Sequence, residues 1–436
     1  MGRRRQARTL FVWMNGLPLG QLTREGGRLR FRYDASWLER PEATPLCSAL
    51  PLSSDTYPDD AVAHFFDNLL PDHEAIRRRM ELALDARSAR PFDLLEAAGA
   101  DCVGALSLLP DGVRPDVRRV DARPISPGEI ASLLRSSTDQ PLGMRRDEEE
   151  FRISIAGAQE KTALLWHEGA WHRPHGATPT SHILKPPIGS LGLGLPNMQD
   201  SVENEWLCLR VVEAFGLPVA RAEIQRFDDA KALVVERFDR QWSRDSSWLM
   251  RLPQEDLCQA LGVSPARKYE SDGGPGIEVV MKLLEAALDP VADRATFMRS
   301  QVVFWLLAAT DGHAKNFSLR LLPGGRTQLL PLYDVLSAYP AVARGEVGAQ
   351  KLKLAMAALG KNRHYRWGLI ERRHWISTAT RCGFSKRAME ALLDECAERI
   401  EPVVEQVRAE LPAGFDAGVA EPIFQGLRAM KLRLVS

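Results

Sequence analysis

The chain has 436 residues, of which 45% are hydrophobic, and its 57 basic and 57 acidic side chains give a formal net charge of zero. This length and composition favour a protein of two or three globular domains. The balanced charge excludes a general attraction to nucleic acid, so any DNA contact has to come from a local patch or from a partner.

The cysteines and the amino terminus predict a cytoplasmic protein. The six cysteines are scattered without a C-x-x-C pair, which argues against a zinc site or a disulfide scaffold and fits a reducing compartment. The first residues, Met1–Gln6, are basic, but the apolar stretch that follows is interrupted by Asn15, Gly16 and Pro18. This is a poor signal peptide, and we expect no later segment to span a membrane.

Residues 1–150 predict a β-rich subdomain that also contains helices. The Asn15-Gly16 turn between two apolar runs is typical of a β-hairpin, and residues 110–150, rich in Pro, Asp and Arg, indicate a connection to the next domain. The expected elements are hairpin strands at Leu10–Met14 and Leu19–Leu22, a strand at Arg28–Tyr33, and helices at Ala61–Leu70, Phe92–Leu95 and Pro127–Leu134.

Residues 151–238 alternate between strands and one helix. The helix, Val202–Phe215, has an apolar side, and the small residues of the loop Ala156–Lys161 could let backbone N–H groups cradle phosphates. A hairpin loop containing one Gly is also common, and no Walker A sequence is present. We interpret Gly189–Gly194 as a flexible loop. The expected strands are Phe151–Ile155, Thr162–Trp166, Ser181–Lys185 and Lys231–Glu236.

Residues 239–436 predict a mostly helical lobe, with strands only around Phe317–Leu321 and Leu329–Leu332. The apolar helix Phe297–Ala309 should contribute Val302, Phe304, Trp305 and Leu306 to the core. A β-rich lobe followed by a helical lobe is the bilobal order of kinases. We therefore expect an α+β, protein-kinase-like fold with an N-terminal subdomain (1–150), the nucleotide-binding part of the N-lobe (151–238) and a catalytic C-lobe (239–436).

Two aspartates carry the strongest chemical signal. Asp311 and Asn316 have the spacing D-x-x-x-x-N, which a kinase catalytic loop uses to place a proton acceptor and a metal ligand on one turn. Asp334 follows at the distance of a β-hairpin, where a kinase places its main magnesium-binding Asp. An acid at the carboxyl end of a helix is disfavoured by the helix dipole, so Asp311 needs a functional reason. Each acid alone could instead cap a helix or a turn, and His313 could be structural.

Lys185 and Glu236–Phe238 each have two interpretations. Lys185, at a strand end, is either an ordinary solvated lysine or the strand lysine that holds ATP phosphates and pairs with a helix glutamate. Glu203 and Glu205 are the available partners, and Glu205 is preferred because it lies near the apolar helix face. Glu236–Phe238 follows a buried strand and is either an adenine-binding hinge or a charged strand exit.

The ordered set of motifs resembles the HipA-type serine/threonine kinases, the toxins of bacterial toxin–antitoxin modules. The likeness runs nearly from end to end. The segments that carry it are Val12–Asn15, Phe65–Asp72, Phe151–Lys161, His182–Lys185, Leu252–Asp256, Lys268–Gly276 and the two catalytic segments.

The resemblance implies ATP and Mg²⁺ as cofactors, Asp311 as the catalytic base, and Asn316 and Asp334 as metal ligands. It implies autophosphorylation at Ser154, which would push the phosphate loop out and silence the enzyme. The residues implied to bind ATP are Ala156, Gly157, Ala158, Gln159, Glu160, Lys161, Lys185, Glu236, Arg237, Phe238, His313, Ala314, Lys315, Asn316, Tyr333 and Asp334.

The implied partners are a small helix-turn-helix, HipB-like antitoxin that also represses the operon, and a protein substrate such as glutamyl-tRNA synthetase or another aminoacyl-tRNA synthetase. Operator DNA would be reached mainly through the antitoxin, because Thr380 stands where a lysine is expected in the DNA-facing region, although Arg372, Arg373 and Arg381 keep it basic. The loop also lacks the H-R-D of ordinary protein kinases. A small-molecule phosphotransferase and a non-catalytic co-repressor remain alternative functions.

Overall fold

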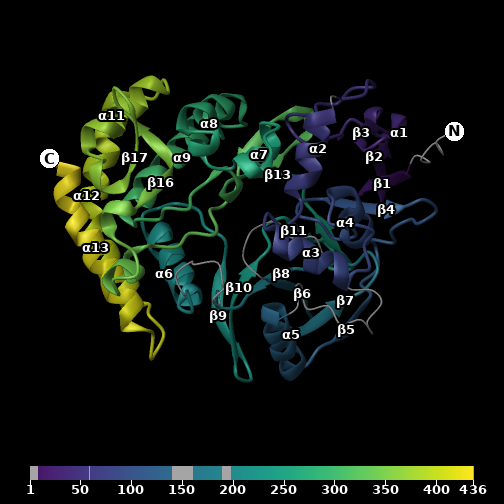
Figure 1. The fold of residues 1–436 in the computed structure, drawn as a ribbon, viewed down its shortest axis with the longest axis horizontal. Helices are drawn as coiled ribbons and strands as arrows, with labels where there is room; N and C mark the ends of the chain where they lie inside the picture. Colours follow the sequence, from purple (N-terminus) through teal and green to yellow (C-terminus); the bar gives the residue numbers. More distant parts are fainter. Residues whose placement is uncertain (1–7, 58, 140–160, 189–197, 436) are drawn as a thin grey trace. The chain divides into compact units, whose positions relative to one another are not determined.

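The computed structural model describes residues 8–57, 59–139, 161–188 and 198–435. The chain divides into two units, and each is built from non-consecutive segments (Figure 1). The first unit contains Met1–Pro186, Gln225–Ala266 and Ser318–Arg326, and the second contains Pro187–Ile224, Arg267–Phe317 and Thr327–Ser436. The division predicted from the sequence at residues 150 and 238 stays a prediction.

The first unit begins with a four-stranded antiparallel sheet in the order β3-β2-β1-β4. Asn15 and Gly16 both have positive φ, 49° and 80°, as a two-residue hairpin turn requires. The strands and helices of this part are β1 (Arg8–Met14), β2 (Leu17–Glu25), β3 (Arg28–Tyr33), α1 (Ala35–Leu38), α2 (Asp59–Asn68), α3 (Glu74–Ala83), α4 (Pro91–Ala98) and β4 (Leu106–Pro110). The predicted hairpin and helices are confirmed here.

A six-stranded sheet follows, in the order β5-β7-β6-β8-β10-β9. Helix α5 covers it, because Ile130, Ala131 and Leu134 share one buried cluster with side chains of β6, β8 and β10. The elements are β5 (Ala122–Pro124), α5 (Pro127–Asp139), β6 (Thr162–His167), β7 (Ala170–Pro174), β8 (His182–Lys185), β9 (Ala222–Phe227) and β10 (Ala230–Glu236). Strands β5, β7 and β9 were not predicted, and the predicted strand Phe151–Ile155 lies outside the described residues.

The segments after β10 that belong to the first unit are short strands and one helix. They are β11 (Arg240–Trp242), β12 (Leu249–Arg251), β13 (Gln254–Asp256), α7 (Leu257–Ala260) and β14 (Ser318–Leu321). Strand β11 pairs with β12, and β13 pairs with β14 although more than sixty residues separate them in the sequence. The expectation of strands only around 317–321 and 329–332 after Phe238 was therefore wrong.

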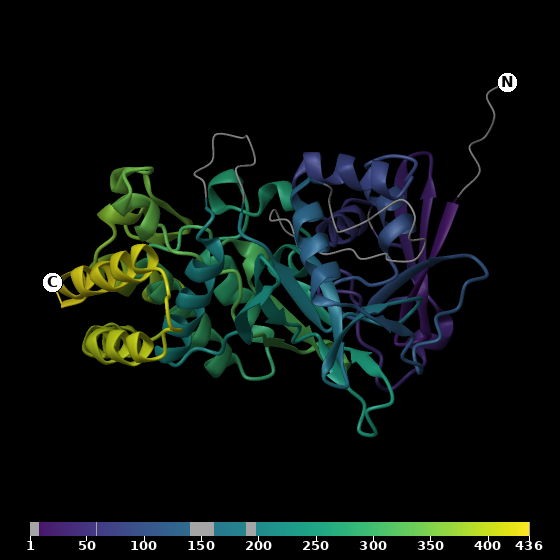
Figure 2. The same ribbon diagram turned by 90° about the horizontal axis from the view of Figure 1, so that it is seen from below.

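The second unit is mainly helical, and α12 and α13 lie side by side (Figures 1 and 2). The predicted core residues of α9, Val302, Phe304, Trp305 and Leu306, are all buried. The elements are α6 (Ser201–Ala214), α8 (Ile277–Leu283), α9 (Pro290–Leu306), β15 (Thr327–Leu329), α10 (Tyr339–Ala343), β16 (Lys353–Leu359), β17 (Arg363–Arg366), α11 (Arg372–Arg381), α12 (Lys386–Ala409) and α13 (Ala417–Val435). The hairpin β16–β17 is a further set of strands that the sequence reasoning missed.

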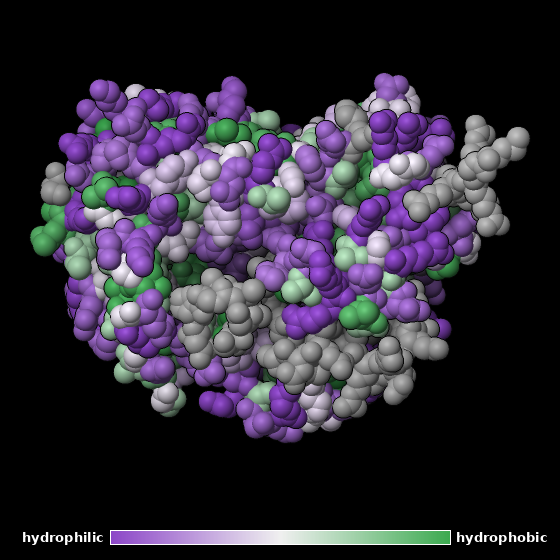
Figure 3. Space-filling model, viewed as in Figure 1, coloured by the Kyte–Doolittle hydropathy of each residue, from purple (hydrophilic) through white to green (hydrophobic). Residues whose placement is uncertain are grey.

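Short 3₁₀ helices connect these elements in the described part of the chain: η2 (Pro265–Arg267), η3 (Glu270–Asp272), η4 (Leu284–Ala286), η5 (Ala314–Asn316), η6 (Pro323–Gly325), η7 (Ala349–Lys351) and η8 (Trp367–Leu369). On the face shown in Figure 3, hydrophilic residues predominate and hydrophobic residues form small separate groups. Within the described ranges, no helix is both long and apolar enough to cross a membrane.

Candidate active site

Asp311 lies in an exposed turn after helix α9. The helix ends at Leu306, three residues before the predicted end, and Ala308 then takes a left-handed conformation with φ of 49°. The chain has therefore left the helix axis before it reaches Asp311. Dipole effects fall off within the last turn of a helix. The predicted unfavourable interaction between the Asp311 carboxylate and the helix dipole is therefore weakened.

Hydrogen bonds between the residues of the D-x-x-x-x-N motif close this turn. The Asn316 side-chain Nδ2 donates a hydrogen bond of 2.8 Å to the backbone carbonyl of Asp311. The backbone N–H groups of His313 and Asn316 donate to the carbonyls of Asp311 and His313, at 2.7 and 2.9 Å. Because Nδ2 is the donor, the Oδ1 atom of Asn316 is oriented as an acceptor, and no described residue donates to it.

The turn is packed tightly against helix α9. A Cβ atom at Gly312 would lie 2.6 Å from the Phe304 ring, so a side chain there would require the ring to move. His313, Ala314 and Lys315 are buried behind the exposed carboxylate. The sequence thus builds a rigid loop with one acid at its surface.

Asp334 lies in a second loop that is anchored on both sides. Before it, the Leu332 backbone exchanges hydrogen bonds of 2.9 and 2.8 Å with Pro218 and Ala220. After it, the side chain of Asn204 exchanges hydrogen bonds of 2.8 and 2.9 Å with the backbone of Ser337. Asp334 itself is half-buried and has φ of 60°.

The two loops are joined directly. The Tyr333 hydroxyl donates a hydrogen bond of 2.9 Å to the Lys315 carbonyl, one residue from Asn316 on one side and from Asp334 on the other. The second unit therefore brings together the predicted residues Asp311, His313, Ala314, Lys315, Asn316, Tyr333 and Asp334.

Lys185 is the last residue of β8 and pairs with Leu233 in β10. Only 7% of its surface is exposed, so the interpretation as an ordinary solvated strand-end lysine was wrong. Lys161 directly precedes β6 and is half-buried. Both belong to the first unit, whereas Glu205, buried in α6, belongs to the second. The predicted pairing of Lys185 with Glu205 stays a prediction.

Arg237, predicted at the adenine hinge, directs its side chain into a buried ion cluster. Its Nε donates to Asp239 Oδ1 at 3.0 Å, and its Nη1 donates to the Thr180 hydroxyl at 2.8 Å. Its backbone N–H donates to the Ser181 carbonyl at 2.9 Å. The Arg237 side chain is therefore engaged within the protein, which leaves only the backbone of this residue for the predicted contact with nucleotide. Glu236, on the preceding strand, is exposed.

The rest of the ion cluster, defined as Asp101, Arg237, Asp239, Arg240 and Arg251, is also buried. Arg240 Nη2 and Arg251 Nε donate to Asp101 Oδ1 at 2.9 and 3.1 Å. Burial alone would raise the pKa of the Asp101 carboxyl, but the guanidinium groups of Arg240, Arg251 and Arg237 hold it well below its usual range. The Asp101 carboxyl thus stays ionised at neutral pH.

The predicted phosphorylation site and most of the predicted phosphate loop cannot be placed. Ser154 and residues 156–160 lie outside the described residues, as does the predicted flexible loop Gly189–Gly194.

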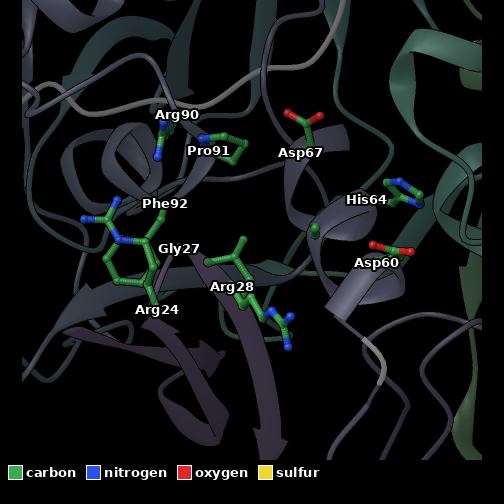
Figure 4. A pocket seen from close by; sticks show the side chains of 11 residues that line it. Arg24, Gly27, Arg28, Asp60, His64, Asp67, Arg90, Pro91 and Phe92 are labelled. Atoms are coloured by element: carbon green, nitrogen blue, oxygen red, sulfur yellow. The ribbon is translucent and has the colours of Figure 1, made fainter. Parts of the chain in front are cut away.

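A separate polar pocket of about 620 Å³ lies in the N-terminal part of the first unit (Figure 4). Helix α2 places Asp60, His64 and Asp67 on one side, and Arg24, Arg28 and Arg90 lie across from them. Several of these groups have partners already: Arg24 pairs with Asp93 at 2.8 Å, and Asp67 pairs with Arg77 at 2.5 Å. None of the predicted catalytic residues lines this pocket, so its size does not make it the reaction site.

Comparison with known proteins identifies the family. A model of the HipA-like C-terminal domain matches residues 153–404, and a model of the HipA N-terminal domain matches residues 10–109. The chain belongs to the HipA family of kinases. The Y4mE protein of Sinorhizobium fredii is 33% identical over 411 residues, which cover 91% of this chain and 92% of that protein.

Two comparisons with HipA of Shewanella oneidensis extend the match. The serine/threonine-protein kinase toxin HipA is 28% identical over 342 residues, covering 76% of this chain and 75% of the toxin. A chain in the solved complex of HipA, HipB and operator DNA matches with a TM-score of 0.79 at 25% identity, over 97% of both chains. The predicted family and the predicted α+β fold class are confirmed.

The region predicted to face DNA in HipA relatives lies on α11. The exposed Thr380 donates its hydroxyl to the Ile376 carbonyl at 3.0 Å, and Arg372 pairs with Asp394 at 2.8 Å. Arg373 and Arg381 are exposed. Because Arg373 also pairs with Glu371, at 2.9 Å, Arg381 is the one of the three predicted arginines without an ion-pair partner among the described residues.

Sequence reasoning missed two features of the site. One is the ion cluster, whose only sequence signal was the group of charged residues around the end of β10. The other is Tyr269, whose hydroxyl donates a hydrogen bond to Asp311 Oδ1. The motif Lys268–Gly276 had been recognised as part of the resemblance, but no role followed from it.

Proposed function

We propose that this protein is an ATP- and Mg²⁺-dependent serine/threonine protein kinase that acts in the cytoplasm as the toxin of a toxin–antitoxin module. The observation that carries the proposal is the pair of joined loops bearing Asp311, Asn316 and Asp334. Family membership supports it, because a relative that matches 76% of this chain is named a serine/threonine-protein kinase toxin.

Asp311 would be the catalytic base. Its exposed carboxylate would orient the substrate hydroxyl and accept the proton as the hydroxyl oxygen bonds to the γ-phosphorus and the bond to the β–γ bridging oxygen breaks, releasing ADP. A rigid loop suits this role, because phosphoryl transfer depends on positioning more than on covalent help from the protein.

Asp334 and Asn316 would hold Mg²⁺, which neutralises phosphate charge when it is bound. The donor set fits the ion, because Mg²⁺ prefers oxygen ligands and is commonly bound by one or two protein groups together with substrate phosphates. The acceptor orientation of Asn316 Oδ1 agrees with this role. Within the described ranges, no cluster of three or more His, Cys, Asp or Glu residues could hold a metal by itself.

The residues proposed for ATP in the first unit have different roles. Lys185 would hold phosphates, supported by its buried position on β8. Residues 156–161 would form the phosphate loop. The backbone of residues 236–238 would contact adenine, with the Arg237 side chain acting only as an anchor.

The proposed partners come from the family. A HipB-like helix-turn-helix antitoxin would neutralise the kinase and carry it to operator DNA, since a similar protein was solved with HipB and its operator. The proposed substrate is an aminoacyl-tRNA synthetase, with glutamyl-tRNA synthetase as the first candidate, and Ser154 is the proposed autophosphorylation site.

The test is transfer of label from [γ-³²P]ATP, with Mg²⁺ and a bacterial lysate that retains its small molecules, by wild type, Asp311→Asn and the exposed-carboxylate control Glu405→Gln. We expect labelled protein with wild type and the control, and a loss on the order of 10²–10⁴-fold with Asp311→Asn. Label confined to small molecules would identify a small-molecule phosphotransferase. No transfer by wild type, together with antitoxin-dependent operator binding, would identify a co-repressor.

A further inference from the structure

The carboxylate of Asp311 is not simply exposed to solvent. The Tyr269 hydroxyl donates a hydrogen bond to its Oδ1 atom. Within the described residues this is the hydrogen bond that the carboxylate accepts, since Asn316 bonds the backbone of Asp311 and not its side chain. One carboxylate oxygen is therefore occupied, and Oδ2 of the exposed Asp311 accepts no hydrogen bond from a described residue.

Tyr269 is fixed against the same loop at two further points. Its ring packs edge-on against the His313 ring, with centroids 5.0 Å apart and an interplanar angle of 86°, a favourable arrangement for aromatic pairs. The preceding carbonyl, of Lys268, accepts a hydrogen bond of 3.2 Å from the Ala314 N–H. Backbone, ring and hydroxyl thus all contact the segment from Asp311 to Ala314.

The segment that carries Tyr269, residues 268–276, is itself rigid, and we call it the brace. A Cβ atom at Gly274 would lie 1.9 Å from the Arg267 carbonyl oxygen and 2.7 Å from the Tyr269 carbonyl oxygen, so only glycine fits. Gly273 has φ of 85°, in the left-handed region.

The brace is also tied to the β16–β17 hairpin of the same unit. The Glu270 carboxylate accepts hydrogen bonds of 2.7 Å from the Ala357 N–H and of 2.7 Å from Arg363 Nε. A Cβ atom at Gly276 would lie 2.4 Å from this carboxylate, so a side chain there would displace the Glu270 carboxylate from its present position. The brace is therefore held in place independently of the loop that it contacts.

We propose that Tyr269 is a positioning residue that fixes the rotamer of Asp311 through Oδ1 and leaves Oδ2 to receive the proton of the substrate hydroxyl. The inference rests on the proposed kinase function. An exposed aspartate samples several rotamers, and orienting a reacting group before the substrate binds lowers the barrier to reaction. A phenol on a rigid segment achieves this without a second charge beside the carboxylate.

The experiment compares ADP formation by wild type, Tyr269→Phe and the control Tyr365→Phe, whose hydroxyl makes no hydrogen bond within the described residues. Phe retains the ring against His313 and removes only the donor. We expect kcat to fall about 10- to 100-fold in Tyr269→Phe, with the KM for ATP and the melting temperature unchanged, and no effect in Tyr365→Phe. Tyr269→Phe should cost nothing further when added to Asp311→Asn.

A second measurement does not depend on activity. In protein labelled with [¹³C]aspartate, the carboxyl signal of Asp311 is identified by its absence in Asp311→Asn, and we expect it to shift in Tyr269→Phe but not in Tyr365→Phe. An unchanged signal or an unchanged kcat in Tyr269→Phe would overturn the proposal for Tyr269. Equal ADP formation by wild type and Asp311→Asn would instead overturn the proposed function, while the carboxyl signal would still test the contact.

Discussion

The backbone of Asp334 has a positive φ of 60°. A positive φ is uncommon outside glycine, and Asp and Asn adopt it more readily than most residues. Here the loop is anchored at Leu332 and Ser337, so the surrounding structure determines the conformation and Asp334 accommodates it. Residues in this region of φ and ψ cluster at functional sites, which supports the proposed metal role.

The first prediction separates the effect of the Asp334 charge from the effect of its backbone conformation. Asp334→Asn retains a residue that tolerates φ of 60° and removes the negative charge. We expect Mg²⁺-dependent ATP binding, measured by calorimetry, to weaken at least tenfold while the melting temperature stays near the wild-type value. ATP binding in EDTA is the control, and equal affinity of both proteins for Mg·ATP would contradict the role of Asp334.

At the scale of single residues, the sequence predicted which residues belong to the site better than it predicted where their side chains point. Asp311, Asn316 and Asp334 follow from spacing, because their contacts are local or one hairpin away. The buried direction of the Arg237 side chain does not, because Asp101 and Thr180 lie far from it in sequence. The same holds for Tyr269, which reaches Asp311 from forty-two residues away.

At the scale of elements, the ion cluster joins the hairpin β11–β12, the end of helix α4 and the end of strand β10. Arg240 and Arg251 belong to the hairpin β11–β12, Asp101 follows α4, and Arg237 follows β10. The Asn15 side chain adds two hydrogen bonds, of 2.8 and 2.9 Å, to the Arg251 backbone. The N-terminal hairpin turn and the proposed hinge are therefore fixed to the same group of charges.

The second prediction concerns Asp101. Replacing it with Asn leaves the buried guanidinium groups short of one negative charge, and breaking a buried ion pair in this way costs about 3–5 kcal/mol. We expect Asp101→Asn to lower the melting temperature at pH 7 by on the order of 10 °C, whereas the exposed Asp111→Asn should change it little.

The pH dependence of this stability has a definite sign. Because the pKa of folded Asp101 is lowered from 3.8, its stabilising contribution is fully present above about pH 4 and is lost as the pH falls further. The melting temperatures of wild type and Asp101→Asn should therefore approach each other only in strong acid. A gap that closes between pH 7 and pH 5 would show that another group is responsible.

Elements with local signals were predicted well, and those that depend on distant partners were not. The Asn15-Gly16 hairpin and helices α6 and α9 follow from turn chemistry and periodicity. Strand β16, Lys353–Leu359, consists largely of Ala, Leu and Met, which favour helices. Pairing with β17 and burial override that preference.

At the scale of the whole molecule, Ser154 provides the prediction about regulation. A phosphate on Ser154, just before the proposed phosphate loop, would add about −1.5 to −2 charges and repel the phosphates of ATP. We expect purified wild type to carry one phosphate by intact mass, located at Ser154 and absent in Asp311→Asn. Ser154→Asp should be inactive and Ser154→Ala active, and full activity of Ser154→Asp would refute the switch.

The non-consecutive make-up of the first unit has a consequence for synthesis on the ribosome. Strand β13 emerges long before β14, its partner, so its edge stays unpaired until translation has passed residue 321. Asp311 and Asn316 are added to the nascent chain before the segment 318–326 that completes the first unit. Because distant pairing is slow to form, a growing chain already contains its proposed catalytic loop while the first unit is unfinished. The proposed site is incomplete at that stage, because Asp334 follows the last segment of the first unit.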